Sequence, residues 1–524
     1  MLHGENSNQS RWLQKSLNNL FRIIFSRTMI IVVLLLVNFL LVFSFIFDLF
    51  QGLPILFGSM VVFTAIMELF VLNTREDPTV KLSWCVIIAV LPLFGACLYF
   101  FVRFDLGHRA HRHLVNSSIQ SSLPYSKQDH DLSEKIRKNE LHLHNIVQYL
   151  DGYGHFPVYE RTETAYFPLG EDMFREMLIH LEKAEKFIFM EYFLVARGQM
   201  WDSILEILQR KAKQGVEVRV MYDGMCAFMN LPYDYPRELE KMGIRCKMFS
   251  PVRPFVSTHY NNRDHRKITV IDGHTAFTGG INLEDCYINR EVRYGHWKDT
   301  AVMVQGNAAQ GFTRIFLQLW NASEKQRIFE PYLNLPEIVP DAQGYVIPYA
   351  DSPTDADQVG EMVYLNILNQ AQQYVYIMTP YLILDDKTAT AIKFAAQRGT
   401  DVRIVLPHIP DKQSAFLLAK SHYEELIGAG VRIYEYTPGF VHGKVFLSDD
   451  LCAVVGTINL DYRSLYHHFE CGAYLYKVDA LADIKADFTD TMEKSQEITM
   501  EDVKKQSLFT RISGKLLKIA APLM

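Results

Sequence analysis

Three long apolar runs dominate the first hundred positions of this chain of 524 residues. They cover Met29 to Phe47, Leu53 to Leu72 and Leu82 to Val102. Each run is long enough to cross the hydrocarbon core of a bilayer as a helix. We therefore predict a cytoplasmic or interfacial tail over residues 1–28 and a transmembrane region of about three helices over residues 29–103. Buried helices of a soluble core are the alternative, and a cleaved signal peptide is disfavoured because no short apolar run ends in a small-residue cleavage site.

Basic residues leave the orientation of these helices open. Lys and Arg precede the first run, lie between the second and third runs, and follow the third. The preference of basic loops for the cytoplasm would put both ends of the region on one side of the membrane, which three crossings do not allow. Either one run does not cross fully or the amino end lies outside.

Beyond about Asp131, short β-branched runs alternate with amphipathic helical patterns, which is typical of α/β layering. A strand, a helix and a second strand are predicted over residues 186–195, 202–215 and 216–224. The same order returns over residues 374–383, 388–399 and 400–408, and GVEVRV at Gly215 resembles GTDVRI at Gly399. The pattern indicates an internal duplication whose period is too long for a solenoid. We predict two similar α/β domains that face each other across a pseudo-two-fold axis.

The repeat pattern also sets the predicted domain boundaries. We expect a juxtamembrane linker over residues 104–130, a first domain over 131–335, a second over 336–500 and an amphipathic helix over 501–524. The helix, SLFTRISGKLLKIAAPLM, is basic and apolar on one face, so it could lie in a lipid interface or dock on the second domain.

Charge and cysteine content restrict the chemistry. The formal net charge is −6, so affinity for an anion must be built locally, and no basic stripe favours nucleic acid. The seven cysteines form no close pair and no metal-type spacing, which favours reduced, mostly buried thiols.

One constellation occurs in each half of the chain. His, Lys and Asp follow the spacing H-x-K-x4-D in HRKITVID and HGKVFLSD, and a Gly and an Asn come later at equal offsets. The first copy contains His265, Lys267, Asp272, Gly279 and Asn282; the second contains His442, Lys444, Asp449, Gly456 and Asn459. Two copies with the same downstream offsets are very unlikely to arise by chance.

The spacing suggests displacement at phosphorus without a metal or cofactor. Residues two apart on a strand share a face, so each His points with its Lys, whereas the odd step to each Asp turns the carboxylate away. The Asp therefore suits a structural role, and His and Asp do not form metal-ligand geometry. Two imidazoles can act as nucleophile and as general acid and base, while the Lys and Asn side chains stabilise negative charge on the phosphate oxygens.

Each reactive His needs an acceptor on its other ring nitrogen. Asp299 lies downstream of the first motif and Glu470 downstream of the second, with Glu284 and Asp461 as rivals.

These motifs resemble the phospholipase D superfamily, and most closely its bacterial cardiolipin synthases. The resemblance covers nearly the entire chain beyond the first apolar run, and it is carried by NNRDHRKITVIDG, FTGGINLEDCYINR, YGHWKDT, PGFVHGKVFLSDD and GTINLDYRSLYHHFE. The apolar segment DPTVKLSWCVIIAVLPLFGACLYF and the terminal segment are similar to that family as well. The fold implied is two tandem phospholipase D-like α/β/α sandwich domains after a membrane region.

The resemblance implies roles for individual residues. His265 matches the nucleophile and His442 the general acid; Lys267, Lys444, Asn282 and Asn459 match phosphate-binding positions, and Asp299 and Glu470 fit the acidic partners. The family's Ser is replaced by Gly280 in the first copy and by Thr457 in the second, so phosphate contacts at Gly280 would come from the backbone.

The activity that the family implies is transfer of a phosphatidyl group between two phosphatidylglycerols, giving cardiolipin and glycerol, at a bacterial cell membrane. Neither nucleic acid nor a metal is an expected partner. Hydrolysis with water as acceptor, or phosphatidylserine synthesis, would use the same residues and stays open. A non-catalytic scaffold would be expected to have lost a His or Lys, and both motifs are intact.

Overall fold

The computed structural model describes residues 53–74, 78–103, 106–126, 128–251, 262–338, 340–354 and 357–523. It divides into a small unit around residues 53–110 and a large unit that contains nearly all residues from 111 to 522. The first predicted apolar helix, Met29 to Phe47, lies outside the described residues.

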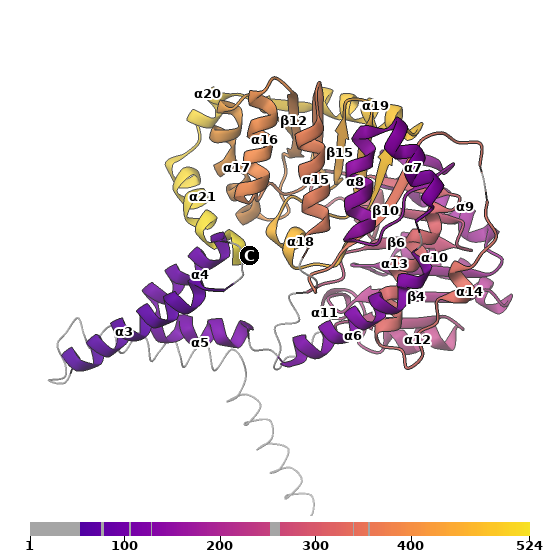
Figure 1. Cartoon of the computed structure of the whole chain (residues 1–524), viewed down its shortest axis with the longest axis horizontal. Coiled ribbons are helices and arrows are strands. Elements are labelled where there is room, and N and C mark those ends of the chain that lie inside the picture. Colours follow the sequence, from indigo (N-terminus) through magenta and orange to yellow (C-terminus); the bar gives the residue numbers. More distant parts are fainter. Residues whose placement is uncertain are drawn as a thin grey trace, which may run out of the picture. The chain divides into compact units, whose positions relative to one another are not determined.

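The small unit consists of three helices, α3 (Leu53–Leu72), α4 (Pro78–Val90) and α5 (Pro92–Arg103) (Figure 1). The prediction of one continuous helix over Leu82 to Val102 is wrong. Pro92 has no N–H to donate and disfavours the helical conformation of Leu91 before it, so the run breaks there. In the described part of the chain, no helix combines the length and apolar character that a membrane span requires.

The first half of the large unit contains a seven-stranded mixed sheet. Its order is β2-β9-β7-β6-β3-β4-β5. The strands are β2 (Glu163–Phe167), β3 (Phe187–Tyr192), β4 (Glu217–Asp223), β5 (Arg245–Phe249), β6 (Lys267–Ile271), β7 (Thr275–Gly279) and β9 (Ala301–Gln305). Strands β3, β4 and β5 pair in parallel, and all other neighbours pair antiparallel.

The second half repeats this arrangement. Its sheet runs β1-β10-β17-β16-β15-β11-β12-β13-β18, and the seven central strands have the pairing directions of the first sheet. The strands are β1 (Tyr159–Glu160), β10 (Tyr345–Asp351), β11 (Tyr374–Met378), β12 (Asp401–Pro407), β13 (Arg432–Tyr436), β15 (Val445–Ser448), β16 (Cys452–Gly456), β17 (Glu470–Tyr476) and β18 (Ser495–Ile498). The predicted duplication into two mixed α/β sheets is confirmed at the level of strand order.

A buried helix lies between the sheets. All residues of α13 (Ala308–Ala322) except Gln310 are buried, and the helix shares one apolar core with residues of both sheets, such as Phe189 and Val346. The outer face of the first sheet is covered by α9 (Gly170–Lys183), α10 (Gln199–Lys213) and α12 (Tyr235–Lys241). α15 (Val359–Gln370), α16 (Asp386–Gln397), α17 (Gln413–Gly428) and α19 (Ala480–Glu493) belong to the second half. The shorter helices are α11 (Cys226–Met229), α14 (Glu330–Leu333) and α18 (Tyr462–Tyr466).

Two predicted boundaries differ from the structure. The expected linker over residues 104–130 contains a helix, α6 (Leu106–Ser122), whose residue Val115 is fully buried in the core of the large unit. The elements α7 (His130–Asn139), α8 (Leu141–Gly152) and β1 precede the first repeat, and β1 pairs with β10 of the second sheet. The first repeat therefore begins at β2. Sequence periodicity identifies such elements but does not indicate which sheet they join.

The carboxyl-terminal region forms two helices where one was expected. α20 (Met500–Lys504) ends before α21 (Leu508–Ala520), which lies against α17. The short α20 has a complete capping box, in which Thr499 and Asp502 each satisfy a backbone N–H of the other.

Candidate active site

The two motif histidines are buried next to the inner strands of the two sheets. His265 precedes β6, and His442 lies between β14 (Gly439–Val441) and β15. Each of these residues is 7 % exposed. β6 and β15 hold corresponding positions in their sheets, so the two motifs lie at equivalent places in the two repeats.

The carboxylate partner of each histidine comes from the opposite half of the chain. Nδ1 of His265 lies 2.9 Å from Oε1 of Glu470, and Nδ1 of His442 lies 2.6 Å from Oδ2 of Asp299. Both carboxylates are fully buried. An ionised carboxylate can only accept a hydrogen bond, so it holds the hydrogen of a neutral imidazole on Nδ1 and leaves the Nε2 lone pair available.

Backbone pairing between the halves explains this crossed arrangement. β14 pairs in parallel with β8 (His296–Lys298), and Val441 is the register partner of Lys298. His442 and Asp299 are the next residues of the two strands. In the other half-site a parallel bridge joins Asp264 to Phe469, just before His265 and Glu470. Each histidine is therefore aligned with its carboxylate by the strand that comes before it.

The motif lysines are buried cations beside the histidines. The Nζ atom of Lys267 donates to the carbonyl oxygen of His265 at 2.6 Å, and Lys444 donates to the carbonyl oxygen of His442. Burial lowers the pKa of Lys267 to about 8 and that of Lys444 to about 7. Both lysines therefore gain or lose their charge near pH 7, and a bound anion would favour their charged forms.

The two histidines are electrostatically connected across the site. Burial lowers the pKa of His265 well below its usual range, with further contributions from Lys267, Lys444 and His442. Burial and Lys444 lower the pKa of His442 to about 4, although Asp299 opposes the shift. Both rings are thus neutral at pH 7, and the charges of each half-site act on the other.

The carboxylates differ in their titration. Burial raises the pKa of Asp299, but the charges of His442 and Lys444 outweigh it, so the net pKa of Asp299 is lowered. Burial raises the pKa of Glu470 well above its usual range, and Lys267 only partly opposes this. Glu470 consequently becomes ionised at a higher pH than Asp299, and it is the ionised form that keeps the hydrogen of His265 on Nδ1.

The motif aspartates hold turns and do not reach the histidines. Asp272 accepts hydrogen bonds from the backbone N–H groups of Glu185, Lys186 and Phe187 at 2.7–2.8 Å. Asp449 accepts from Gln372, Gln373 and Tyr374 at 2.7–2.9 Å. Both aspartates are in the left-handed conformation, with φ of 53° and 55°. Each aspartate ties the turn after its motif strand to the start of the neighbouring strand.

The two departures from the family motif have different structural reasons. A Cβ atom at Gly280 would lie 2.0 Å from Oδ1 of Asp299, so any side chain there would displace that carboxylate. Thr457 occupies the equivalent place in the second half, where its hydroxyl donates to Glu470 and accepts from the N–H of Cys471. Gly280 therefore makes room for the shorter acid, and Thr457 fixes the longer one.

The equal offsets of Gly279 and Gly456 from their motif histidines have a similar cause. A Cβ atom at Gly279 would lie 2.3 Å from the carbonyl oxygen of Thr300, and one at Gly456 would lie 2.5 Å from that of Cys471. Both glycines let the strand approach the strand that carries the carboxylate.

The motif asparagines are placed differently from each other. Asn282 accepts from the N–H of Leu194 at 3.0 Å and donates to the hydroxyl of Tyr287 at 2.8 Å. The Oδ1 atom of Asn459 is buried without a hydrogen-bond partner among the described residues. Asn282 therefore orients Tyr287, whose ring lies 5.5 Å from that of His442.

The rival acids of the sequence analysis have other partners. Glu284 forms an ion pair with Arg293 at 2.5 Å, and Asp461 caps α18 by accepting from the N–H of Ser464 at 2.7 Å. Neither is hydrogen-bonded to His265 or His442 in the structure.

Two buried residues of the site were not predicted. Arg266, between His265 and Lys267, donates from Nε to the carbonyl oxygen of Glu470 at 3.2 Å, and so fixes the backbone that carries this carboxylate. The ring of His468 lies 5.5 Å from that of His265. Its position two residues before Glu470 in HHFE was the available signal.

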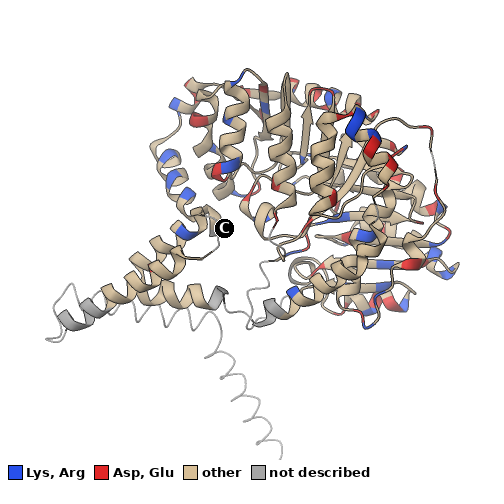
Figure 2. Cartoon of the chain, viewed as in Figure 1, with Lys and Arg blue, Asp and Glu red and all other residues tan. Residues whose placement is uncertain are grey.

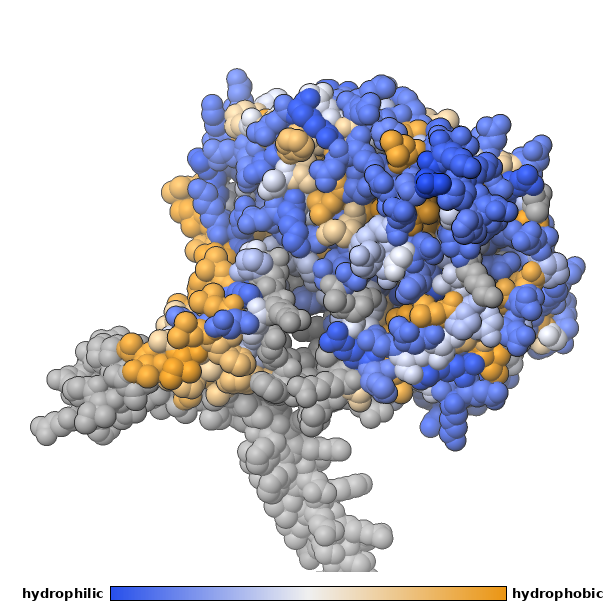
Figure 3. Space-filling model, in the orientation of Figure 1, coloured by the Kyte–Doolittle hydropathy of each residue, from blue (hydrophilic) through white to orange (hydrophobic). Residues whose placement is uncertain are grey.

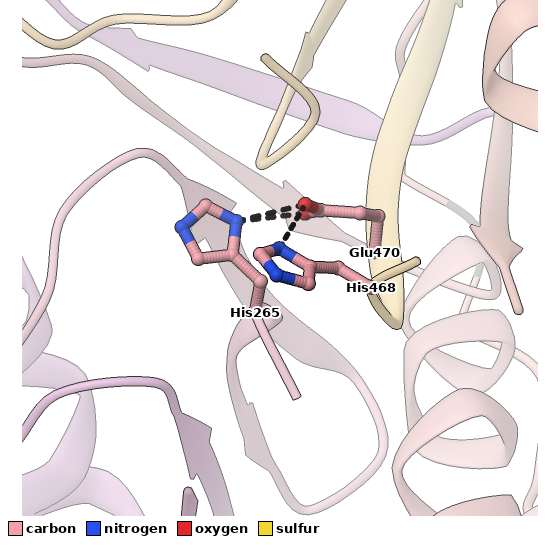
Figure 4. Close-up of side chains that lie close together, drawn as sticks. All are labelled: His265, His468 and Glu470. Carbon is pink, nitrogen blue, oxygen red and sulfur yellow. Dashed lines mark hydrogen bonds and ion pairs between the residues drawn. The ribbon is translucent and has the colours of Figure 1, made fainter. Parts of the chain in front are cut away.

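His265, His468 and Glu470 form a compact cluster (Figure 4). Their ligand atoms lie within 4.8 Å of one another, which makes them the only group of three among the described residues that could hold a metal ion. Imidazole nitrogens and a carboxylate suit a transition metal such as Zn²⁺. An ion there would take the Glu470 oxygens that hold His265, so it would compete with the hydrogen bond that orients this ring.

Comparison with known families identifies both parts of the chain. The model described as "Cardiolipin synthase, PLD-like domain" matches residues 177–320 and 364–492. The model described as "Phospholipase_D-nuclease N-terminal" matches residues 60–103.

Individual proteins are also similar in sequence to most of the chain. Cardiolipin synthase 2 of Bacillus cereus is 34% identical over 86% of this chain and 88% of its own length. The cardiolipin synthase of a Geobacillus strain is 34% identical over 90% of this chain and 94% of its own length. An uncharacterized protein of Streptococcus mutans is 52% identical over 87% of this chain and 99% of its own length. The crystal structure of phosphatidylserine synthase from Haemophilus influenzae shares the fold, with a TM-score of 0.55 at 15% identity over 72% of this chain and 97% of that one.

Proposed function

Because the chain belongs to the cardiolipin synthase family of phospholipase D-like proteins, we propose that it joins two phosphatidylglycerols into cardiolipin and glycerol. The observation that carries this proposal is the pair of neutral, buried imidazoles, each held through Nδ1 by a carboxylate of the other half. Membership makes the chain a phosphatidyltransferase-type enzyme, and the choice of acceptor is the part that we propose.

In the first step, Nε2 of His265 attacks the phosphorus of one phosphatidylglycerol. The P–O bond to its head-group glycerol breaks, and His442 gives that oxygen a proton from Nε2, so glycerol leaves and a phosphatidyl group stays on His265. The bound phosphate anion offsets the positive charge of the two lysines and so raises the pKa of His442. His442 can therefore hold a proton when the substrate is bound.

In the second step, His442 takes the proton from a glycerol hydroxyl of a second phosphatidylglycerol. That oxygen attacks phosphorus, the P–N bond to His265 breaks, and cardiolipin forms. Lys267 and Lys444 stabilise the charge on the non-bridging oxygens in both steps. The buried site limits access of water, which would otherwise give phosphatidic acid.

We also propose that the protein works at the bacterial cell membrane, through the apolar amino-terminal region. The sequence supports this with its apolar runs, and the match of residues 60–103 to an amino-terminal family segment agrees with it. Such an anchor would keep the phosphatidyl-enzyme near lipid alcohols.

The test is conversion of phosphatidylglycerol vesicles by the purified full-length protein with a chelator present. We expect cardiolipin and glycerol in equal amounts. Phosphatidic acid as the only product would identify a hydrolase, and product only from a cytidine-diphosphate lipid with serine would identify a phosphatidylserine synthase. His265→Ala should lower the rate by about a thousandfold or more, whereas Lys213→Ala on the exposed end of α10 should not change it.

A further inference from the structure

The carboxyl-terminal helix α21 has one face fixed to the large unit. At its centre, a Cβ atom on Gly514 would lie 2.8 Å from the carbonyl oxygen of Leu417, so α21 and α17 are in close backbone contact. Ala521, just after the helix, is buried in an apolar cluster with Leu418 and Tyr462. These contacts determine which face of α21 points outward.

The outward face of α21 is apolar. Its exposed apolar side chains are Leu508, Phe509, Ile512, Leu516 and Ile519, which leave 48–74 % of their surface in solvent. Four of them follow helical spacing and form one stripe. Figure 3 shows hydrophobic surface at this edge of the molecule, where Figure 1 places α21. A contiguous apolar stripe of this kind is typical of an interaction surface.

Basic residues border one side of the stripe. Arg511, Lys515 and Lys518 lie on α21, which has no Asp or Glu (Figure 2). Arg511 is 3.7 Å from Glu424 and Lys518 is 4.0 Å from Glu425, and exposed ion pairs at such distances contribute little. A surface that is both apolar and anionic is complementary to this face, and the interface of a bilayer with anionic head groups has both properties.

We propose that α21 lies in the interface of an anionic lipid bilayer, with its apolar stripe among the acyl chains and its cations at the head groups. The helix thereby fixes the distance between the large unit and the lipid surface.

The buried end of α21 connects this surface to the active site. The cluster around Ala521 contains Tyr462 and Ile383, and the N–H of Ile383 donates to the carbonyl oxygen of Leu460 at 2.8 Å. Leu460 directly follows the motif residue Asn459. Docking of α21 thus positions the segment that follows the second motif next to the lipid. This consequence for catalysis rests on the proposed function, whereas the docking itself does not.

The docking test uses the full chain with Cys85 and Cys97 replaced by serine, because the other cysteines are buried. An environment-sensitive dye is placed at Phe509→Cys, with Lys213→Cys as the control. In vesicles of phosphatidylglycerol with brominated acyl chains, we expect several-fold quenching at position 509 and none at position 213. An unquenched dye at position 509 would overturn the proposal. A fluorescence change of the dye at position 509 that depends on protein concentration in detergent, without brominated lipid, would assign the face to a second copy of the chain. This result would also overturn the proposal.

The catalytic consequence has its own test. The triple variant Arg511→Glu, Lys515→Glu, Lys518→Glu should lose about tenfold in kcat/KM on phosphatidylglycerol vesicles and keep its rate on a dispersed short-chain phosphatidylglycerol. Equal losses on both substrates would contradict a docking role. If the proposed function itself is wrong, neither form of the lipid is converted while the dye at position 509 is still quenched.

Discussion

Nδ1 of His265 lies 2.9 Å from Oε1 of Glu470, a carboxylate that reaches it from the opposite half of the chain. The equivalent contact joins His442 to Asp299. Both half-sites therefore depend on both repeats, and the two contacts can be separated by mutation.

Glu470→Gln should slow formation of the phosphatidyl-enzyme by about 10²–10⁴-fold, because the amide no longer stabilises the charge that develops on His265. Asp299→Asn should slow both steps, because His442 acts in each. Rapid quenching with radiolabelled phosphatidylglycerol measures the labelled protein directly. Label on residue 442 in place of residue 265 would reverse the proposed roles of the two histidines.

Gly280→Ser should reduce activity by at least about tenfold, since its Cβ atom would meet the carboxylate of Asp299 at 2.0 Å. Thr457→Ser is the matched control: it keeps the hydroxyl that donates to Glu470 and should stay within about threefold of the parent rate. A fully active Gly280→Ser protein would mean that Asp299 does not need its present position.

Asp272→Ala and Asp449→Ala should each lower stability by about 3 kcal/mol, because three backbone N–H groups lose a charged acceptor. The exposed Asp202→Ala should change it by less than about 0.5 kcal/mol. Thermal unfolding in detergent gives the comparison, and the rate per folded molecule should stay nearly unchanged. A normal melting temperature with lost turnover would show instead that these aspartates act in catalysis.

The rate should fall as pH rises. Burial lowers the pKa of Lys444 to about 7 and that of Lys267 to about 8, so these cations lose the protons that bind the phosphate anion across this range. The lowered pKa of His265 keeps the nucleophile neutral down to acidic pH. We expect kcat/KM to decrease above pH 7, and Lys444→Arg to move the decrease to higher pH because a guanidinium stays charged. A rate that increases between pH 7 and 9 would contradict this assignment.

Chelators should leave the rate unchanged, because the lysines supply the charge that a metal would otherwise provide. Added Zn²⁺ should inhibit by occupying His265, His468 and Glu470, whereas Mg²⁺, which prefers oxygen ligands, should not. His468→Asn should require more Zn²⁺ for the same inhibition. Loss of activity on chelation, restored by one ion, would mean that the reaction needs a metal.

The sequence predicts which side chains belong to the site, but not which of them contact one another. Repeated spacing identified His265 and His442, and strand parity gave Asp272 a structural role before the turn was seen. The crossed pairing of Glu470 with His265 could not be predicted, because spacing along one half contains no information about contacts with the other. From the sequence alone, Gly280 is only a position that lacks the hydroxyl donor of the family's Ser. The structure explains the Gly, because the carboxylate of Asp299 occupies the space that a side chain would need.

The membrane-proximal part was predicted less well. Pro92 ends a helix that apolar content alone would continue, and residues 106–122 form a helix where a linker was expected. Apolar runs indicate where a chain avoids water but not how its helices break. His468 was overlooked because a single histidine beside a candidate acid is usually an ordinary core residue.

The pairing of each histidine with a carboxylate of the other half has a consequence for how the two repeats could have evolved. A single ancestral repeat could have completed this pair of half-sites only by meeting a twin of itself, and both halves would then have stayed chemically identical. In a single polypeptide the two halves are free to differ: Arg266 and Gly280 stand on one side where Gly443 and Thr457 stand on the other. Under the proposed function, donor and acceptor lipids would thus meet unlike surroundings within one enzyme.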